Sequence, residues 1–430
     1  MIVQQGVPQG FTPLFDGATL AGWRGRPHLD PRVEAAWSDE ERARQQAAWD
    51  AEVALHWRVE EGELVNDGEG PFLTTARDYG DAEFTLEYRT VPLADSGIYL
   101  RATPQVQIWD WTEAGGKWEL GADKGSGGLW NNERHTRFPG RRMDAPFGEW
   151  NRFRIRIVGE RVWVWLNGAL VTPAVPMENY WDRTQPLFAR GPLQLQTHGG
   201  EIRFRNLGVR ELGDEEAAAL LHSLPAESPF RRGEPDRAAL QAGSEQALIQ
   251  DEEMSGWRGA RDGWEIADGV LRCKPGSGGA LYTAEEYEDF SVRFEFRLPP
   301  GGNNGLAIRF PGEGDPAYAG MCELQVLDDA APQYAELQPW QYHGSAYGMV
   351  AARRGFQRAA GAWNHQQVTV VGGRVLVELN GVAILDADLH ALPATADGKE
   401  HPGRMRTRGA FGFAGHGDPV EFRNVHVRRL

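Results

Sequence analysis

The chain has 430 residues and a formal net charge of −16 at pH 7, from 45 basic and 61 acidic side chains. A nucleic-acid-binding protein needs a basic footprint, so this charge argues against a nucleic-acid partner. No apolar run approaches the roughly 20 residues that span a bilayer, and we expect no membrane span. A chain of this length is expected to form two or three domains.

The chain begins MIVQQG, which lacks the basic and apolar segments of a signal peptide. We therefore expect either an intracellular protein or a periplasmic or secreted one that begins after a removed signal. The two cysteines, Cys273 and Cys322, have no metal-ligand spacing. The sequence leaves open whether they pair or are two small buried thiols.

One domain occurs twice in the chain. Short motifs of the first half return in the same order in the second half, up to the C-terminus, which indicates a tandem duplication. We expect a first domain over residues 1–212, a linker over 213–246 and a second domain over 247–430. The recurring motifs include GWRG at 22–25 and 256–259, LNG at 166–168 and 379–381, and FRN at 204–206 and 422–424.

Each copy is predicted to be all-β. Stretches such as VWVWL (162–166) and IRFR (202–205) alternate between two kinds of side chain, the period of a strand. The dipeptides Asn167-Gly168 and Asn380-Gly381 each predict a tight hairpin turn. Many short strands joined by glycine- and proline-containing turns indicate a sandwich or a barrel.

Residues 26–56 have no counterpart in the second copy. The pair Ser38 and Glu41 forms a capping box, which predicts a helix that begins near Asp39. This insertion could cover a site or pack on a sheet edge, and we favour packing. In the linker, residues 213–221 predict a short helix, and residues 225–243 are polar and rich in turn formers.

Two strand pairs have unusual polar faces. In DSGIYLR (95–101) and QVQIWD (105–110), aliphatic side chains alternate with arginine, amide and aromatic groups. A solvent-exposed face without a binding role would favour Lys, Glu, Ser and Thr. The same design returns in NNGLAIR (303–309) and ELQVLD (323–328). We expect these strands to form the floor of a groove in each copy.

Several runs together resemble the 3-keto-disaccharide hydrolase domain family. They are LFDGATLAGW (14–23), DSGIYLR (95–101), QVQIWD (105–110), GEWN (148–151) and GPLQLQTHG (191–199). The resemblance covers both copies, nearly the whole chain outside the insertion and the linker. It implies two tandem concanavalin-like jelly-roll sandwiches, each with one concave sheet. It also implies action on carbohydrates oxidised to a ketone at carbon 3.

The chemistry of such a substrate indicates which side chains to seek. A ketone at carbon 3 acidifies the hydrogen on carbon 2, so a base can remove that proton and the glycosidic oxygen can leave. This elimination, followed by addition of water, needs a base, an acid and a group that stabilises the enolate. A conventional glycosidase would instead need two facing carboxylates, for which Glu295 and Glu323 are candidates. A carbohydrate-binding protein without turnover is the alternative.

The alternation assigns candidate residues to the groove of each copy. The carboxylates and histidines are candidate acids and bases, and Arg101 and Arg309 are candidate enolate stabilisers. Purely structural roles are the alternatives: a cross-strand ion pair between Arg101 and Glu87, a turn role for His198 and a core role for Trp109. The candidate catalytic residues are Glu87, Arg101, His198, Glu295 and Glu323; the candidate substrate-binding residues are Tyr99, Gln105, Gln107, Trp109, Gln196, Arg309, Gln325 and His416.

The two grooves differ in composition. The first is richer in aromatic and amide groups, so we expect it to be the working copy. The second has an extra carboxylate, because Glu323 stands where the first copy has Gln105. No cofactor is certain from the sequence. Asp110 and Asp328, at strand ends, could hold calcium or another divalent cation through their oxygens, although turn capping is favoured.

Overall fold

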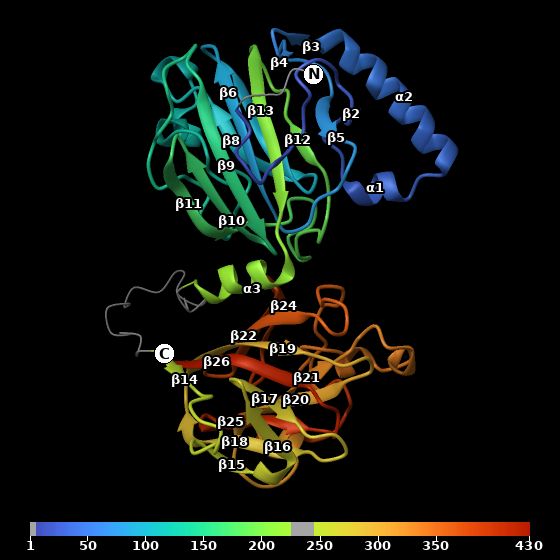
Figure 1. The fold of residues 1–430 in the computed structure, drawn as a ribbon, viewed down its shortest axis with the longest axis vertical. Helices are drawn as coiled ribbons and strands as arrows, with labels where there is room; N and C mark the ends of the chain where they lie inside the picture. Colours follow the sequence, from blue (N-terminus) through green and yellow to red (C-terminus); the bar gives the residue numbers. More distant parts are fainter. Residues whose placement is uncertain (1–5, 225–244) are drawn as a thin grey trace. The chain divides into compact units, whose positions relative to one another are not determined.

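The computed structural model describes residues 6–224 and 245–430. Contacts divide the chain into unit 1, which ends at Gly213, and unit 2, which begins at Asp214. The turn-rich segment expected in the linker, residues 225–243, lies outside the described residues. Each unit contains two antiparallel sheets, one of eight strands and one of five (Figure 1). The expected all-β tandem sandwich is confirmed.

In unit 1 the eight-stranded sheet has the order β11-β10-β9-β6-β13-β4-β3, with β1 paired to β13, and the five-stranded sheet has the order β2-β5-β12-β7-β8. The strands of the larger sheet are β1 (Thr12–Pro13), β3 (Trp57–Glu60), β4 (Glu63–Asn66), β6 (Ala82–Thr90), β9 (Asn151–Val158), β10 (Arg161–Leu166), β11 (Ala169–Pro176) and β13 (Ile202–Glu211). Those of the smaller sheet are β2 (Trp23–Arg26), β5 (Phe72–Thr75), β7 (Asp95–Leu100), β8 (Thr103–Trp109) and β12 (Leu193–Leu195).

Unit 2 repeats this topology, with the orders β16-β17-β26-β19-β22-β23-β24, with β14 paired to β26, and β15-β18-β25-β20-β21. Its larger sheet contains β14 (Gln246–Ala247), β16 (Trp264–Ala267), β17 (Val270–Cys273), β19 (Phe290–Arg297), β22 (Trp363–Val371), β23 (Arg374–Leu379), β24 (Val382–Asp388) and β26 (Glu421–Arg429). Its smaller sheet contains β15 (Trp257–Gly259), β18 (Gly279–Tyr287), β20 (Asn303–Phe310), β21 (Cys322–Leu327) and β25 (Gly409–Gly415).

Alternation along the strands builds one core between the two sheets of each unit. Ile98 and Val106 of the smaller sheet and Phe84 and Ile155 of the larger one belong to a single buried cluster in unit 1. Side chains at the intervening positions of β7 and β8 therefore face away from the core. Unit 2 is built in the same way, with its own buried cluster.

The predicted hairpins and helices are present. Asn167 and Gly168 both have positive φ, 50° and 84°, and join β10 to β11 in a two-residue turn. Asn380 and Gly381 do the same between β23 and β24. The helices are α1 (Pro31–Ala35), α2 (Asp39–His56), α3 (Asp214–His222) and α4 (Pro316–Ala319), with short 3₁₀ turns at Glu113–Gly115, Trp118–Leu120, Ala122–Lys124, Arg261–Gly263, Pro332–Tyr334, Pro339–Gln341 and Pro402–Met405.

The insertion packs on the edge of the smaller sheet of unit 1. The Ser38 hydroxyl accepts a hydrogen bond from the Glu41 N–H at 3.2 Å, the cap that the sequence predicts. Helix α2 contacts β2 and β3, and Figure 1 shows α1 and α2 outside the sandwich on this side. No helix within residues 6–224 and 245–430 is long and apolar enough to cross a membrane.

Candidate functional site

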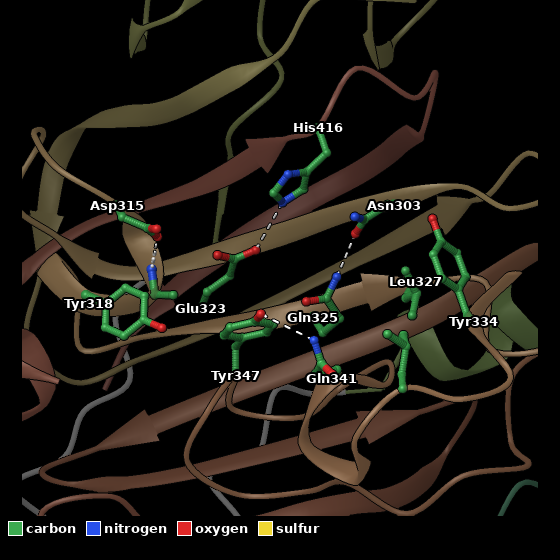
Figure 2. A pocket seen from close by; sticks show the side chains of 12 residues that line it. Asn303, Asp315, Tyr318, Glu323, Gln325, Leu327, Tyr334, Gln341, Tyr347 and His416 are labelled. Carbon is green, nitrogen blue, oxygen red and sulfur yellow. Dashed lines mark hydrogen bonds and ion pairs between the residues drawn. The ribbon is translucent and has the colours of Figure 1, made fainter. Parts of the chain in front are cut away.

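A cavity of about 380 Å³ opens on the outer face of the five-stranded sheet of unit 2 (Figure 2). Its floor comes from β20 and β21, and its walls come from α4, the loop after β21 and the residue after β25. The lining is polar and aromatic, the composition of a site for a small polar ligand. The lining residues are Asn303, Asp315, Ala317, Tyr318, Glu323, Gln325, Leu327, Tyr334, Leu337, Gln341, Tyr347 and His416.

Glu323 and His416 point toward one another in this cavity (Figure 2). Nε2 of His416 lies 3.5 Å from a carboxylate oxygen of Glu323. Glu323 lies on β21, and its carboxylate rests over Gly305 of β20. A Cβ atom at position 305 would lie 1.9 Å from the Glu323 oxygen, so only glycine allows this placement. The loop after His416 is tied to β20, because the Asn303 N–H donates to the Asp418 carboxylate at 3.0 Å.

The pair supplies an acid and a base. The hydrogen bond to Glu323 raises the pKa of His416 above its ordinary value, against the opposing effect of burial. His416 therefore stays protonated to a higher pH than a free histidine and can donate a proton. Among the described residues, the Glu323 carboxylate is hydrogen-bonded to His416 alone, so it keeps lone pairs for a proton on a ligand.

Amide and hydroxyl groups surround the pair. Gln325 donates from Nε2 to Oδ1 of Asn303 at 2.6 Å, which fixes both amides on the floor. The Tyr347 hydroxyl accepts a hydrogen bond from Gln341 at 3.4 Å, and the Tyr318 hydroxyl accepts one from Lys399 at 3.4 Å. Because each hydroxyl acts as an acceptor in these bonds, its own proton can be given to a ligand oxygen.

A second cavity, of about 580 Å³, adjoins the first. The two share Asp315 and Tyr318, and the second is completed by Ala319, Pro402, Gly403, Met405 and Arg406. Tyr318 forms the wall between them and is held from behind by His401, whose ring stacks on it at a centroid distance of 4.6 Å. Met405 is 57% exposed here, so this second cavity presents an exposed apolar side chain.

The corresponding face of unit 1 has a different charge arrangement. Asp95, the counterpart of Asn303, accepts hydrogen bonds from Lys117, from Gln107 at 2.8 Å and from His198 at 3.3 Å. Burial acts to raise the pKa of Asp95, but the bonds from His198 and Lys117 bring it below its ordinary value. The bond to Asp95 in turn raises the pKa of His198. Each unit thus has a histidine–carboxylate pair, but the carboxylate comes from a different strand.

The remaining floor residues of unit 1 are engaged with their own neighbours. Gln105 donates to Gln107, and Gln196 lies 3.5 Å from the Tyr99 hydroxyl. That hydroxyl is also 2.9 Å from Nδ1 of His28, which belongs to the insertion. Trp109 is buried and donates to the Gly125 carbonyl at 2.9 Å, under the loop that follows β8.

Arg101 and Arg309 do not join these floors. Each has a positive φ, 53° and 48°, so the strict alternation that assigned them to the groove breaks at this point. Arg101 donates to the carbonyls of Gly159 and Phe188 and pairs with Asp81 at 3.1 Å. Arg309 is held by backbone carbonyls and Asp289 in the same manner. Both arginines therefore hold loops together at the end of a strand. The expectation that they lie in the groove of each copy is wrong.

Glu87 and Glu295 also require a correction, because they lie on the other sheet of each sandwich. Glu87, on β6, is bonded to Arg152, Arg205 and Asn206. Glu295, on β19, is bonded to Arg423 and to Asn424 at 2.8 Å. The sequence pattern assigned each residue to a face but not to a sheet. Glu295 and Glu323 lie on different sheets and do not face each other, and Glu87 does not pair with Arg101.

The candidate cation ligands act as loop caps. Asp110 accepts the N–H groups of Leu93 and Thr112, and Asp328 accepts those of Gly301 and Ala330. Within the described parts of the chain, no three His, Cys, Asp or Glu side chains gather in a metal-binding arrangement. Cys273 and Cys322 are both buried free thiols.

Sequence reasoning missed the walls of the unit 2 cavity. Asp315 and Tyr318 come from GDPAYAG (314–320), and Tyr334, Gln341 and Tyr347 come from the long segment after β21. The second of these segments is a loop rich in tyrosine and glutamine, which is a usable signal for a polar ligand. Nothing in their spacing shows that they fold back over the floor.

Comparison with known proteins identifies similar sequences and structures. The 3-keto-alpha-glucoside-1,2-lyase-like domain matches residues 10–210 and 244–428. The 3-keto-disaccharide hydrolase of Bacteroides thetaiotaomicron is 25% identical over 224 residues, which are 43% of this chain and 77% of that protein. A solved Parabacteroides distasonis structure, provisionally named a glycosyl hydrolase, is 24% identical over 44% of this chain and all of its own, with a TM-score of 0.39. A carbohydrate-binding module of Bacillus subtilis is 13% identical over 40% of this chain and 93% of its own, with a TM-score of 0.28.

Proposed function

Because the chain belongs to the 3-keto-alpha-glucoside-1,2-lyase-like domain family, we propose that it cleaves 3-keto-glycosides in the cavity of unit 2. The observation that carries this proposal is the Glu323–His416 pair in an open polar cavity. The choice of unit 2 departs from the expectation based on composition, which favoured the first groove. It is supported by the state of the two carboxylates, since Asp95 is bonded to three side chains and Glu323 to one.

The first step is proton removal. Glu323 takes the proton from carbon 2 of the keto sugar, and the electrons of the C2–H bond move into an enolate with the negative charge on the carbon 3 oxygen. Tyr318 and Tyr347 can donate hydrogen bonds to that oxygen, which stabilises the charge as it develops. They replace Arg101 and Arg309, whose guanidinium groups are bonded elsewhere.

The second step is loss of the leaving group. The enolate collapses back to a ketone, a C1–C2 double bond forms, and the bond from carbon 1 to the glycosidic oxygen breaks. His416 gives its proton to that oxygen, which leaves as an alcohol. Because the acid and the base lie 3.5 Å apart, they can serve neighbouring substrate atoms from one side. Water then adds across the double bond and gives the free 3-keto sugar.

The adjoining cavity is suited to the leaving group. The polar cavity would hold the keto sugar, and the cavity beyond Tyr318 would receive the group released from it. Met405 and Pro402 there provide apolar surface, which favours a leaving group with an apolar or ring face. A second sugar ring also presents such a face.

The test uses the full chain and a 3-keto-glucoside of a coloured phenol, with phenol release as the measured quantity. We expect release by the unaltered protein and by Asp95→Asn, but not by Glu323→Gln. Binding of the glycoside without any release would instead show a carbohydrate-binding protein. Loss of release in Asp95→Asn with retention in Glu323→Gln would assign the chemistry to unit 1.

Elimination and direct hydrolysis differ in the fate of the carbon 2 hydrogen. In deuterium oxide, elimination followed by hydration leaves deuterium on carbon 2 of the released 3-keto sugar, and direct hydrolysis does not. Free 3-keto-glucose incubated with the Glu323→Gln protein measures the background exchange. Release without deuterium above this background would exclude the elimination route.

A further inference from the structure

A third pocket, of about 340 Å³, lies in unit 1 between the insertion and the end of the smaller sheet. We call it the arginine pocket, because five arginines line it together with only two carboxylates. One wall comes from β2, α1 and α2, and the other from the segments around Asp78, Arg101 and Arg190. The lining residues are Arg24, Arg26, Pro31, Glu34, Ala35, Arg42, Asp78, Arg101, Ala102, Arg190, Gly191 and Pro192.

The lining of this pocket carries more guanidinium groups than carboxylates. Five guanidinium groups meet the carboxylates of Glu34 and Asp78, and three of the arginines also pair with a carboxylate outside the lining: Arg42 with Asp39, Arg101 with Asp81 and Arg190 with Glu211. Glu34 is already shared between Arg26 at 2.6 Å and Arg24 at 3.2 Å. A concave surface lined by one sign of charge concentrates ions of the opposite sign.

Arg26 supplies a second, independent observation. Its side chain is 1% exposed, and Nη1 has no hydrogen-bond acceptor among the described residues. Nε of Arg26 donates to Glu34 and Nη2 donates to the Leu29 carbonyl, so the guanidinium is fixed with one donor unused. A buried donor without a partner destabilises the fold, which calls for an explanation such as a bound ion. Burial also lowers the pKa of Arg26, an effect that a bound anion would oppose.

We propose that the arginine pocket binds a small organic anion of monosaccharide size that carries a carboxylate, phosphate or sulfate group. Guanidinium groups match these anions with paired hydrogen bonds, and a volume of about 340 Å³ exceeds the needs of a simple ion. The helical insertion then has a role beyond packing, because it contributes Glu34 and Arg42 to the wall. This site is separate from the unit 2 cavity and does not depend on the activity proposed there.

The test is calorimetric titration of the full chain, at low ionic strength, with inorganic phosphate, sulfate and D-glucuronate in separate runs. We expect one site in unit 1 that binds at least one of these probes with a dissociation constant of about 1 mM or tighter. The probe that binds best identifies the anionic group. Absence of binding by all three at about 10 mM would overturn the proposal.

Two matched variants assign the site. Arg42→Gln/Arg190→Gln removes two pocket arginines that are 43% and 57% exposed, so the fold should tolerate it. We expect binding to weaken by about tenfold or more. Arg44→Gln/Arg408→Gln removes the same charge outside the pocket, from arginines 73% and 58% exposed, and should keep the affinity within about twofold. Equal affinity in the two double variants would overturn the proposal.

Discussion

Nε2 of His416 lies 3.5 Å from the carboxylate of Glu323 on the outer face of the smaller sheet of unit 2. In unit 1 the counterpart of His416, His198, lies 3.3 Å from Asp95 instead. The two copies thus keep a histidine–carboxylate pair while the carboxylate moves from β21 in one to β7 in the other. Where unit 2 has Glu323, unit 1 has the amide Gln105. Where unit 1 has Asp95, unit 2 has the amide Asn303. These two differences account for the exchange.

Replacing the base should stop turnover without unfolding the protein. We expect Glu323→Gln to lower kcat by roughly 10²–10⁴-fold, because the amide cannot accept the carbon 2 proton. The measurement is release of a phenol from its 3-keto-glucoside. Glu286→Gln, an exposed carboxylate of the same unit paired to Arg408, is the control and should keep full activity. Full activity in Glu323→Gln would contradict the assignment.

The pH profile should report His416. Its pKa is raised by Glu323, so the proton donor persists above the ordinary histidine value and kcat should fall only at a pH above about 6.5. His416→Gln should remove this alkaline limb as well as most of the activity. His198→Gln, the matched change in unit 1, should keep the limb. An alkaline limb that survives in His416→Gln would have to come from another group.

Gly305 should be intolerant of a side chain. An alanine Cβ there would lie 1.9 Å from the Glu323 oxygen, so the carboxylate must move, and we expect kcat to fall by about 10²-fold with little change in Tm. Gly97→Ala is the matched change in unit 1, where the Cβ would lie 2.9 Å from Oε1 of Gln196. It should leave kcat unchanged. Equal effects of the two substitutions would argue against a role for the position of Glu323.

Glu87 and Glu295 should affect stability rather than chemistry. Each is nearly buried and bonded to arginine and asparagine side chains, so Glu87→Gln and Glu295→Gln should each destabilise the fold by about 1–3 kcal/mol. Thermal unfolding measures the stability of each variant, and phenol release measures its kcat. A loss of kcat with unchanged Tm in either variant would restore a catalytic role for that carboxylate.

Unit 2 should lose stability on mild acidification. Burial lowers the pKa of His343 to about 4 and that of His365 to about 3. Because these values are depressed in the folded state, the unfolded chain binds more protons below about pH 6.5, and stability falls as the pH drops toward them. At pH 5 each histidine should cost on the order of 2 kcal/mol relative to pH 7.5.

Urea unfolding at several pH values measures this loss. His343 lies 2.9 Å from Gln366 and stacks on Phe296, so His343→Gln should unfold more readily at pH 7.5. Its stability should nevertheless change less between pH 7.5 and pH 5, because one titrating group is gone. An unchanged pH dependence would show that His343 does not titrate on unfolding.

The sequence by itself determined the duplication, the all-β sandwich and the main helices. These features follow from local signals: period-two alternation, the Asn-Gly turns and the Ser38 cap each depend on a few neighbouring residues. The same alternation correctly placed Gln325, Glu323 and His416 on one face, because β20, β21 and β25 are adjacent and regular there.

Only the tertiary structure decided which of two sheets each polar face belongs to. Glu87 and Glu295 alternate as well as Gln105 and Glu323 do, but pairing between distant strands placed them on the opposite layer of the sandwich. Arg101 and Arg309 each have a positive φ, which ends the strand alternation at that residue. A period-two pattern in the sequence does not show such a local change of the backbone. The positions of the loops that close the cavity around Glu323 and His416 are likewise set by long-range packing. The spacing of residues along the chain does not predict these positions.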